Sequence, residues 1–444
     1  MTHTRIHRDI TLGNLNRFTM PWRLYFQGLL QFQRSVTGST VPRSHRTFAT
    51  AFPELRHPSG TFSIVSHVHL ADPNLDRKRD VFQTIMPGGE SLLPEDHEEC
   101  SMLPLLHTVY KTMMRLKAFD MTFKQAQRQG RIPFFVESRG EEAAVVASAA
   151  ALDDDDHIFS QYREHGALLW RGASMEAMAH QCCGTRKDSG KGRQMPMHFG
   201  DKEKNFHTIS SPLATQLLHA TGFGYVQKIM NKQHVVACYF GEGAASEGDF
   251  HAALNFASTL KCPVLFICRN NGWSITTPTS QQYAGDGIIS RASGYGITSC
   301  RVDGADARAV YIATRMARAH ILKTSSPVLV ECMTHRLGDH STSDDSRNYV
   351  PREILEEGLQ TGDPIPRLLS FLSRRGSIDM NTSDEIWAHA IQEARMAIAI
   401  AEKEPIEPVM TMFDDVYDTL PYNLQQQKQE CAKYLPHMLH AQIK

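Results

Sequence analysis

Two short apolar segments separated by one helix-length segment constrain the fold more than any other feature of the sequence. Residues 235–240 and 263–268 each read as a buried strand, and residues 247–260 between them read as a helix. Strands that are apolar at nearly every position are typical of parallel sheets, whose strands are joined by helices and buried on both faces. The pattern therefore predicts a βαβ unit within a parallel sheet.

The pattern continues more weakly on either side of this unit. Residues 299–302 and 328–332 read as further strands with a helix over 305–322 between them. Upstream, apolar residues recur at helical spacing over 103–128, and an Ala-rich segment over 141–152 reads as another helix. We predict an α/β fold in which a parallel sheet is flanked by helices, with helical extensions at its N- and C-terminal ends.

Four parts are expected along the chain of 444 residues. They are a leader (1–50), an N-terminal arm (51–100), the α/β domain (101–350) and a C-terminal helical extension (351–444). Within the domain, the four consecutive acids of residues 153–156 are expected to form a solvated helix end or turn without a chemical role.

The composition of the first fifty residues differs from that of the rest. They contain seven Arg, no Lys, and Asp9 as their one acid, which is the profile of a mitochondrial transit peptide. The alternatives are a disordered basic arm and extra upstream residues from an imperfect gene model. The transit-peptide interpretation places the mature protein in the mitochondrial matrix, although the cleavage point cannot be read.

Overall charge and hydropathy exclude several classes of partner. The formal net charge is -1 and the isoelectric point is near 7.1, so no global basic field indicates nucleic acid or an anionic membrane. The longest apolar stretches fall short of the roughly 20 residues of a membrane-spanning helix. The nine cysteines form no CxxC pair with metal spacing, which indicates free thiols in a reducing compartment.

Polar residues follow the two strongest strands where each ends. Gly241, Glu242 and Gly243 follow the first, and Asn270 and Asn271 close the second. Ligands of open parallel sheets bind outside the carboxyl ends of the strands, so these residues should face one crevice. Glycines let backbone N–H groups approach a phosphate, and the next helix points its positive end there.

The oxygen donors at this crevice suit a magnesium-bound diphosphate. The Glu242 carboxylate, the Asn271 amide oxygen, a backbone carbonyl, two diphosphate oxygens and water would complete the octahedral set that Mg²⁺ prefers. Arg269 can pair with phosphate or orient Glu242. Neither motif alone is strong evidence for a diphosphate site, because Gly residues after a strand and Asn pairs in turns are both common. A dinucleotide site is disfavoured, since GEGAASEG does not fit G-x-G-x-x-G and no acid follows at the ribose position.

The stretch from Gly241 to Asn271, which begins with GEG and ends with NN, resembles the thiamine diphosphate motif. The chain is also similar, over roughly residues 100 to 420, to the alpha subunits of the branched-chain 2-oxo acid dehydrogenases. The segments that carry this likeness are RQGRI (128–132), QYRE (161–164), GRQMP (192–196), SSPLATQ (210–216) and RLGDHSTSDD (336–345). The resemblance implies a thiamine diphosphate-binding fold, oxidative decarboxylation of branched-chain 2-oxo acids, and reductive acylation of lipoyl groups on a transacylase core.

The same resemblance implies roles for individual residues. The diphosphate and cofactor pocket would be formed by Tyr162, Arg163, Ser211, Leu213, Gly243, Ala244, Arg269 and His340. Magnesium would be held by Glu242, Asn271 and the backbone of Trp273, and potassium by Ser210, Pro212, Thr215 and Gln216. Arg and His suit a phosphate on chemical grounds alone, whereas Tyr162 could equally be a packed core residue. Ser211 and Pro212 could also simply cap and start a helix.

Partners and regulation follow from the resemblance as well. His340 would position or protonate the lipoyl group as the catalytic residue. A separate beta subunit would supply the activating glutamate, which implies an α2β2 heterotetramer. Ser341 would be a phosphorylation site for a regulatory kinase and phosphatase, and its alternative is an ordinary Ser/Thr/Asp-rich loop. Two-site regulation is not expected, because Pro351 stands at the family's second phosphorylated serine.

The chain departs from the family pattern at two positions near the predicted site. Trp273 stands where relatives often have Tyr, and Asp339 stands where they often have His. If Asp339 lies close to His340, it should raise the pKa of that imidazole. A pyruvate-type alpha subunit and a non-catalytic paralogue are the alternative functions. The sequence does not indicate which branched oxo acid is preferred. These substrates differ by methyl groups, and each methyl group changes the binding free energy by only about 1–3 kcal/mol.

Overall fold

The computed structural model describes residues 54–57, 60–63, 79–93 and 97–441, in two units, 1–71 and 72–444. In the first unit, β1 (Glu54–His57) and β2 (Gly60–Ser63) pair antiparallel. The predicted leader, residues 1–50, lies outside the described residues.

The second unit is built on a five-stranded parallel sheet, as predicted. Its order is β3-β4-β5-β9-β8. The strands are β3 (His157–Phe159), β4 (Val236–Gly241), β5 (Val264–Asn270), β8 (Thr298–Asp303) and β9 (Val328–Met333). The helix α7 (Gly248–Leu260) connects β4 to β5, which confirms the predicted βαβ unit. All seven residues of the central strand β5 are buried.

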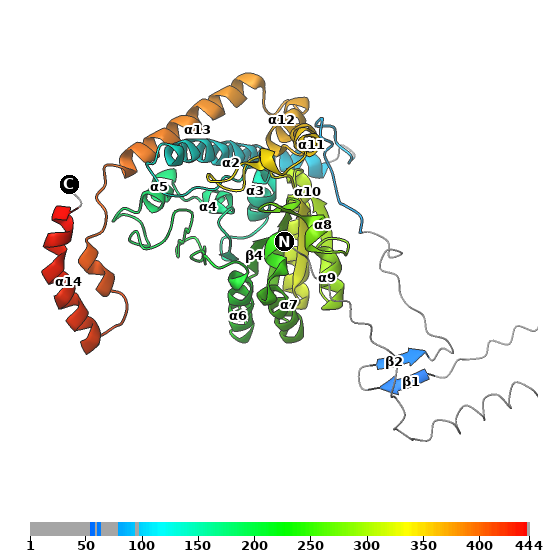
Figure 1. Ribbon diagram of the computed structural model, residues 1–444. Coiled ribbons are helices and arrows are strands. Elements are labelled where there is room, and N and C mark those ends of the chain that lie inside the picture. The colour runs from blue at the N-terminus through cyan, green and yellow to red at the C-terminus, as the bar shows by residue number, and fades with distance from the viewer. Residues whose placement is uncertain (1–53, 58–59, 64–78, 94–96, 442–444) are drawn as a thin grey trace, which may run out of the picture. The chain divides into compact units, whose positions relative to one another are not determined.

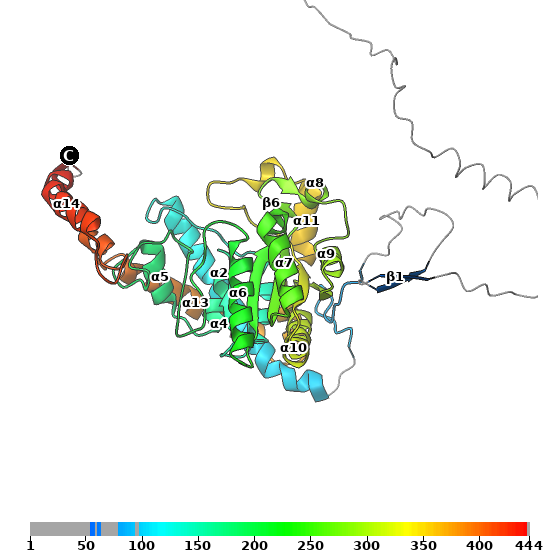
Figure 2. The ribbon, with the colours of Figure 1, turned by 90° about the horizontal axis from the view of Figure 1, so that it is seen from below.

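Alternate residues of the central strands belong to two separate cores, which explains why the strands are continuously apolar. Tyr239 and Ile267 join one core and Phe240 and Phe266 the other. The first core contains residues of α2 (His97–Arg128), α3 (Glu142–Ala150) and α10 (Ala307–Thr324). The second contains residues of α6 (Thr215–Ile229), α7 and α9 (Ile289–Gly294). Figure 1 and Figure 2 show the sheet between these groups of helices.

The remaining elements frame this core. They are α4 (His165–Trp170), α5 (Met175–Cys183), η1 (Glu242–Ser246), β6 (Trp273–Ser274), β7 (Thr277–Pro278), α8 (Thr279–Gln282), η2 (Ser346–Asn348), α11 (Arg352–Thr361), α12 (Pro364–Arg374), α13 (Met380–Ala401), η3 (Val409–Phe413) and α14 (Tyr422–Ala441). In the C-terminal part, α13 packs along α2 and α5 (Figure 1). No helix in the part of the chain that the structure describes combines the length and apolarity needed to span a bilayer.

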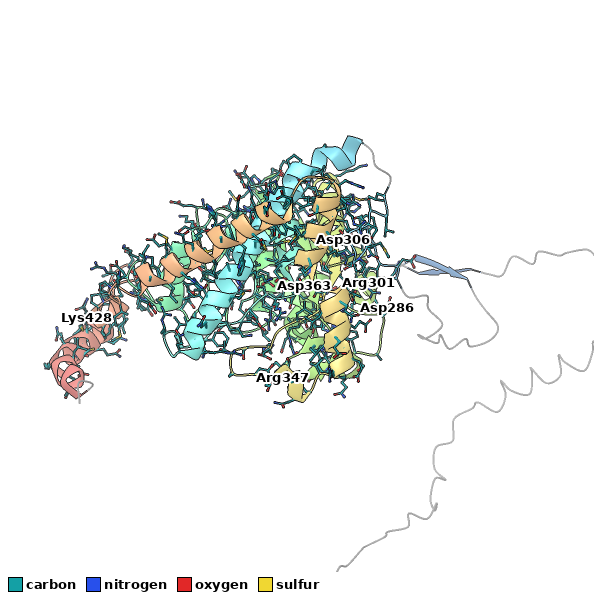
Figure 3. The ribbon with its side chains drawn as sticks, turned by 90° about the horizontal axis from the view of Figure 1, so that it is seen from above. Asp286, Arg301, Asp306, Arg347, Asp363 and Lys428 are labelled. Carbon is teal, nitrogen blue, oxygen red and sulfur yellow. The ribbon has the colours of Figure 1, made fainter. Side chains whose placement is uncertain are left out.

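Ion pairs with a buried member join separate segments of the fold. Arg301 of β8 pairs with Asp286 at 2.9 Å, and both are labelled in Figure 3. The expectation of four solvated acids is wrong for Asp156, which is fully buried. Its carboxylate accepts hydrogen bonds from Arg318 Nε at 2.6 Å and from the Val235 backbone at 2.8 Å, so it ties the start of β4 to α10.

The helix start proposed at Ser211 and Pro212 is also wrong. The helix α6 begins at Thr215, because Ala214 adopts a left-handed backbone with φ of +69° and interrupts the helical path. No side chain in the described part of the chain caps this end. The residues before Ala214 therefore form a loop, and the oxygen atoms of this loop are available as metal ligands.

Candidate functional site

The ends of β4 and β5 bring the two predicted motifs together. Gly241 of β4 pairs with Arg269 of β5, so Glu242 and Asn271 follow side by side. The Asn271 backbone N–H donates to Glu242 Oε2 at 3.3 Å. Gly243 is required locally, because a Cβ there would stand 2.3 Å from Ser274 Oγ. The two motifs predicted to share the carboxyl ends of the strands are therefore in direct contact.

The Glu242 side chain has an unsatisfied oxygen. The residue is 2% exposed, and its Oε1 has no hydrogen-bond partner in the described part of the protein. Burial raises the pKa of this carboxyl, and the negative charge of Glu141 raises it further. A buried carboxylate oxygen without a donor is what a bound cation would satisfy, so this side chain fits a role as a magnesium ligand.

Asn271 and Trp273 supply the other predicted magnesium oxygens. Asn271 Oδ1 accepts from the Trp273 backbone N–H at 3.1 Å, and its Nδ2 donates to Glu141 Oε1 at 2.8 Å. The Trp273 carbonyl is 3.4 Å from Arg336 Nη1. Among the described residues no group of three or more His, Cys, Asp or Glu could hold a metal, so a magnesium site here would mix one carboxylate with amide and carbonyl oxygens.

Arg269 lies between two buried glutamates. Its Nη1 donates to Glu141 and its Nε to Glu164. Burial alone would lower the pKa of the guanidinium, but the two carboxylates raise it above its usual value, so the residue keeps its charge. Its Nη2 lies 3.9 Å from where a Cβ on Gly241 would stand, and so points towards the end of β4. One nitrogen of the predicted phosphate-binding arginine thus faces the crevice.

The segment after β3 is anchored to the same strand end. The other oxygen of Glu164 accepts from the Gln161 backbone N–H at 2.6 Å. The Gln161 side chain in turn accepts from the Gly241 backbone N–H, also at 2.6 Å. These bonds hold residues 161–164 against the end of β4.

Arg163 and His340, both predicted to hold diphosphate, are in direct contact. Arg163 Nη2 donates to the His340 carbonyl at 2.6 Å and lies 3.2 Å from His340 Nδ1. The Tyr162 ring meets the His340 ring edge-on, with the centroids 6.3 Å apart. Tyr162 also packs against the main core, so it contributes to packing whatever else it binds. Because a guanidinium can only donate, Nδ1 of His340 must accept, which leaves its proton on Nε2.

His340 is neutral at physiological pH. Burial lowers its pKa to about 4, and the positive charges of Arg163 and Arg336 act in the same direction. The expectation that Asp339 would raise this pKa is not met. The Asp339 carboxylate instead accepts from the Ser346 backbone N–H and hydroxyl, each at 3.1 Å.

Three of the four predicted potassium ligands, Ser210, Pro212 and Thr215, bring oxygen atoms together at the start of α6. Thr215 Oγ1 lies 2.8 Å from Ser210 Oγ and 3.0 Å from the Pro212 carbonyl. Gln216 Nε2 donates to the Tyr239 carbonyl at 3.1 Å, while its buried Oε1 has no partner among the described residues. The hydroxyl and carbonyl oxygens of the first three residues suit a monovalent cation, and the unsatisfied Gln216 oxygen is a further candidate ligand.

The residues between these oxygens lie nearer the surface. Ser211 Oγ is 2.8 Å from His198 Nε2. Leu213 is 42% exposed, so it can line a pocket only where a ligand or another chain covers it.

The loop that carries Ser341 folds next to His340. Ser341 is partly exposed, and its hydroxyl lies 3.1 Å from Ser343 Oγ. The His340 backbone N–H donates to Asp344 at 2.8 Å. Arg336 ties the base of the loop to the Ile275 carbonyl at 2.8 Å. The hydroxyl predicted to be modified is therefore accessible and adjacent to the candidate catalytic imidazole.

Glu141 and Glu164 lie at the centre of the site, but no role for either residue was predicted from the sequence. The sequence signal available for Glu141 was its position as an acidic residue at the start of a helix whose other residues are almost all apolar. Acids are common in the first turn of helices, so that signal alone could not separate a buried ligand-orienting group from an ordinary helix start.

The chain is similar to a known enzyme family and to several known proteins over most of its length. A family model described as the dehydrogenase E1 component matches residues 110–410. The human 2-oxoisovalerate dehydrogenase subunit alpha, mitochondrial, is 42% identical over 403 residues, which cover 90% of each chain. The protein of that name from Caenorhabditis elegans is 49% identical over 334 residues, covering 74% of this chain and 77% of its own. From Arabidopsis thaliana, subunit alpha 1 is 42% identical over 375 residues, covering 84% and 79%.

Proposed function

Because this chain belongs to the dehydrogenase E1 component family, we propose that it is the alpha subunit of a mitochondrial branched-chain 2-oxo acid dehydrogenase. It takes part in oxidative decarboxylation of branched-chain 2-oxo acids and in transfer of the acyl group to lipoyl groups on a transacylase core. The observation that carries the proposal is the unsatisfied Glu242 oxygen beside Asn271 at the end of the sheet, in a chain whose relatives bear this enzyme name over most of their length.

Thiamine diphosphate is the cofactor that such a site would hold. When bound, it supplies the nucleophilic carbon and the electron sink for decarboxylation. The chain's own part is to bind its diphosphate end. Arg163, Tyr162, His340 and the free nitrogen of Arg269 face that end, and Gly243 and Ala244 let the backbone of η1 approach it.

Two cations complete the proposal. Glu242, Asn271 and the Trp273 carbonyl hold Mg²⁺, which lets a site with few basic groups accept a diphosphate. Ser210, Pro212, Thr215 and Gln216 hold K⁺, which fixes the loop before α6. Ser211 and Leu213 on that loop then line the cofactor and substrate pocket.

The role that we propose for His340 is to orient the lipoyl group. Its pKa of about 4 keeps it neutral, and the contact with Arg163 leaves its proton on Nε2. Nε2 is therefore a hydrogen-bond donor, and we propose that His340 positions the lipoyl group through this atom.

The proposed assembly is an α2β2 heterotetramer in the mitochondrial matrix, imported by means of residues 1–50. The beta subunit supplies the carboxylate that activates the cofactor. A kinase and a phosphatase act on Ser341. A phosphate there would add about -1.5 to -2 charges beside His340 and a site built for diphosphate, which would repel the cofactor or displace the loop.

Co-expression with the beta subunit tests the proposal. The purified complex should decarboxylate branched 2-oxo acids faster than pyruvate in the presence of thiamine diphosphate and Mg²⁺. A preference for pyruvate would instead identify a pyruvate-type alpha subunit, and cofactor binding without turnover would identify a non-catalytic paralogue.

Calorimetry tests the metal site separately. Glu242→Ala should abolish Mg²⁺-dependent binding of thiamine diphosphate, because the substitution removes the buried carboxylate. Unchanged binding would disprove the site assignment.

A further inference from the structure

We propose that Glu141 is a positioning residue that sets the orientation of the Asn271 amide and of the Arg269 guanidinium at the same time. This inference rests on the proposed magnesium-diphosphate function of the site. Glu141 itself contacts neither the metal nor the cofactor in this assignment. It acts through the two residues that do.

Both oxygens of Glu141 are used by the site. The residue is fully buried, at 0% exposure. Its Oε1 accepts from Asn271 Nδ2 at 2.8 Å, and its Oε2 accepts from Arg269 Nη1. The carboxylate therefore bridges one residue predicted to bind magnesium and one predicted to face phosphate.

The bridge decides which end of the Asn271 amide faces outwards. An ionised carboxylate can only accept hydrogen bonds, so Asn271 must present its NH2 group to Glu141. The amide oxygen is then turned away from Glu141, where it accepts from the Trp273 backbone N–H at 3.1 Å. Magnesium requires that oxygen, since the NH2 group has no lone pair available for a metal. A flipped amide would present the wrong atom.

Tight packing explains why Glu141 reaches the end of β5. Gly140 before it has φ of +91°, and a Cβ there would stand 2.0 Å from the His335 carbonyl oxygen. The Leu337 backbone N–H also donates to the Arg139 carbonyl at 3.1 Å. These contacts press the start of α3 against the segment that follows β9. The first side chain after Gly140 is thereby fixed beside the end of the sheet.

Glu164 provides a matched control for the ion pair alone. It is also a fully buried glutamate, and it also accepts from Arg269, through Nε. Its other oxygen accepts from the Gln161 backbone N–H at 2.6 Å, and Glu164 forms no hydrogen bond with Asn271 within the described residues. Loss of either carboxylate removes one partner of Arg269, but only loss of Glu141 frees the Asn271 amide.

The test measures magnesium affinity in the complex with the beta subunit, at saturating thiamine diphosphate, by calorimetry. Glu141→Gln should weaken Mg²⁺ binding roughly ten-fold to a hundred-fold, as loss of groups that orient metal ligands does elsewhere. Glu164→Gln, which removes one charge beside Arg269 but leaves the Asn271 amide held by Glu141, should weaken Mg²⁺ binding clearly less than Glu141→Gln does. Glu141→Asp, which keeps the charge but shortens the side chain, provides a second variant if the amide variant does not fold.

A reciprocal substitution gives a readout that a merely structural role would not move. In the double variant Glu141→Gln with Asn271→Asp, the introduced amide donates to the introduced carboxylate and again turns an oxygen towards the metal. Mg²⁺ affinity should recover relative to Glu141→Gln alone.

Three results would separate the possibilities. Equal losses in Glu141→Gln and Glu164→Gln, without recovery in the double variant, would overturn the inference and leave only a structural ion pair. Wild-type Mg²⁺ affinity in Glu141→Gln or Glu141→Asp would overturn it as well. If the wild-type complex itself bound thiamine diphosphate without Mg²⁺, the proposed function would fail instead.

Discussion

Replacement of Asp339 by alanine should loosen the loop that carries His340 and Ser341. One oxygen of Asp339 accepts both hydrogen bonds from Ser346, each at 3.1 Å. The other oxygen lies 3.7 Å from Lys124 Nζ and 3.9 Å from Arg128 Nη2 on α2. The residue that departs from the family pattern thus joins the two ends of the loop and holds them to α2.

The magnitude follows from these contacts. A hydrogen bond to a charged acceptor contributes about 1.5–3 kcal/mol, and a partly exposed ion pair about 0–1 kcal/mol. The two bonds share one oxygen, and the Asp339 side chain is 21% exposed, so their contributions do not simply add. We expect Asp339→Ala to cost about 2 kcal/mol of local stability, which is roughly a thirty-fold larger opening equilibrium of the loop.

Hydrogen exchange measured by mass spectrometry over residues 336–350 reports this opening directly. Asp345→Ala is the matched control, because its carboxylate pairs with Arg347, an exposed side chain labelled in Figure 3, and does not bridge the loop. Exchange should accelerate about thirty-fold in Asp339→Ala and little in Asp345→Ala. Equal exchange in Asp339→Ala and wild type would refute the reasoning, and equal acceleration in both variants would show that any lost acid loosens the loop.

Three further predictions concern regulation, packing and pH. Ser341→Glu should reduce lipoyl acylation by the assembled complex, whereas Ser343→Glu should reduce it less, and full activity of Ser341→Glu in a lipoyl-domain assay would contradict a regulatory role. Gly140→Ala should lower the thermal midpoint more than Gly130→Ala, because both residues have positive φ but a Cβ meets an atom within 4 Å only at Gly140; equal midpoints would contradict the packing argument. Burial lowers the pKa of His207 from 6.5 to about 4, so the unfolded chain binds its proton first and stability falls as pH drops from 6.5 towards 4. The thermal midpoint should therefore decrease less over that range in His207→Leu than in wild type, and identical pH profiles would exclude a contribution from this imidazole.

Local pattern was sufficient to predict the sheet and the placement of its ligand-binding end. The apolar runs of β4 and β5 predict strands buried on both faces, and parallel strands bring their carboxyl ends to one edge. Glu242 and Asn271 therefore meet for reasons that can be read from the sequence. That Arg163 and His340 belong to one site was implied only by the resemblance, since the two residues are 177 positions apart, and their direct contact was not predicted.

Other features were decided by tertiary contacts that no local pattern records. The acid run at residues 153–156 reads as uniformly solvated, yet Asp156 is buried because Arg318, 162 positions later, reaches it. The left-handed backbone of Ala214 breaks the helix that Ser211 and Pro212 would have begun.

The strongest case is Glu141. Its partner Asn271 lies 130 positions away, and the orientation of that amide depends on which atoms surround it after folding. The oxygens at the end of the sheet can be identified from local pattern alone, because strand periodicity and connection length are local properties. Which of those oxygens point outwards depends on the folded chain, because a side chain's orientation is set by hydrogen-bond partners brought together from distant segments.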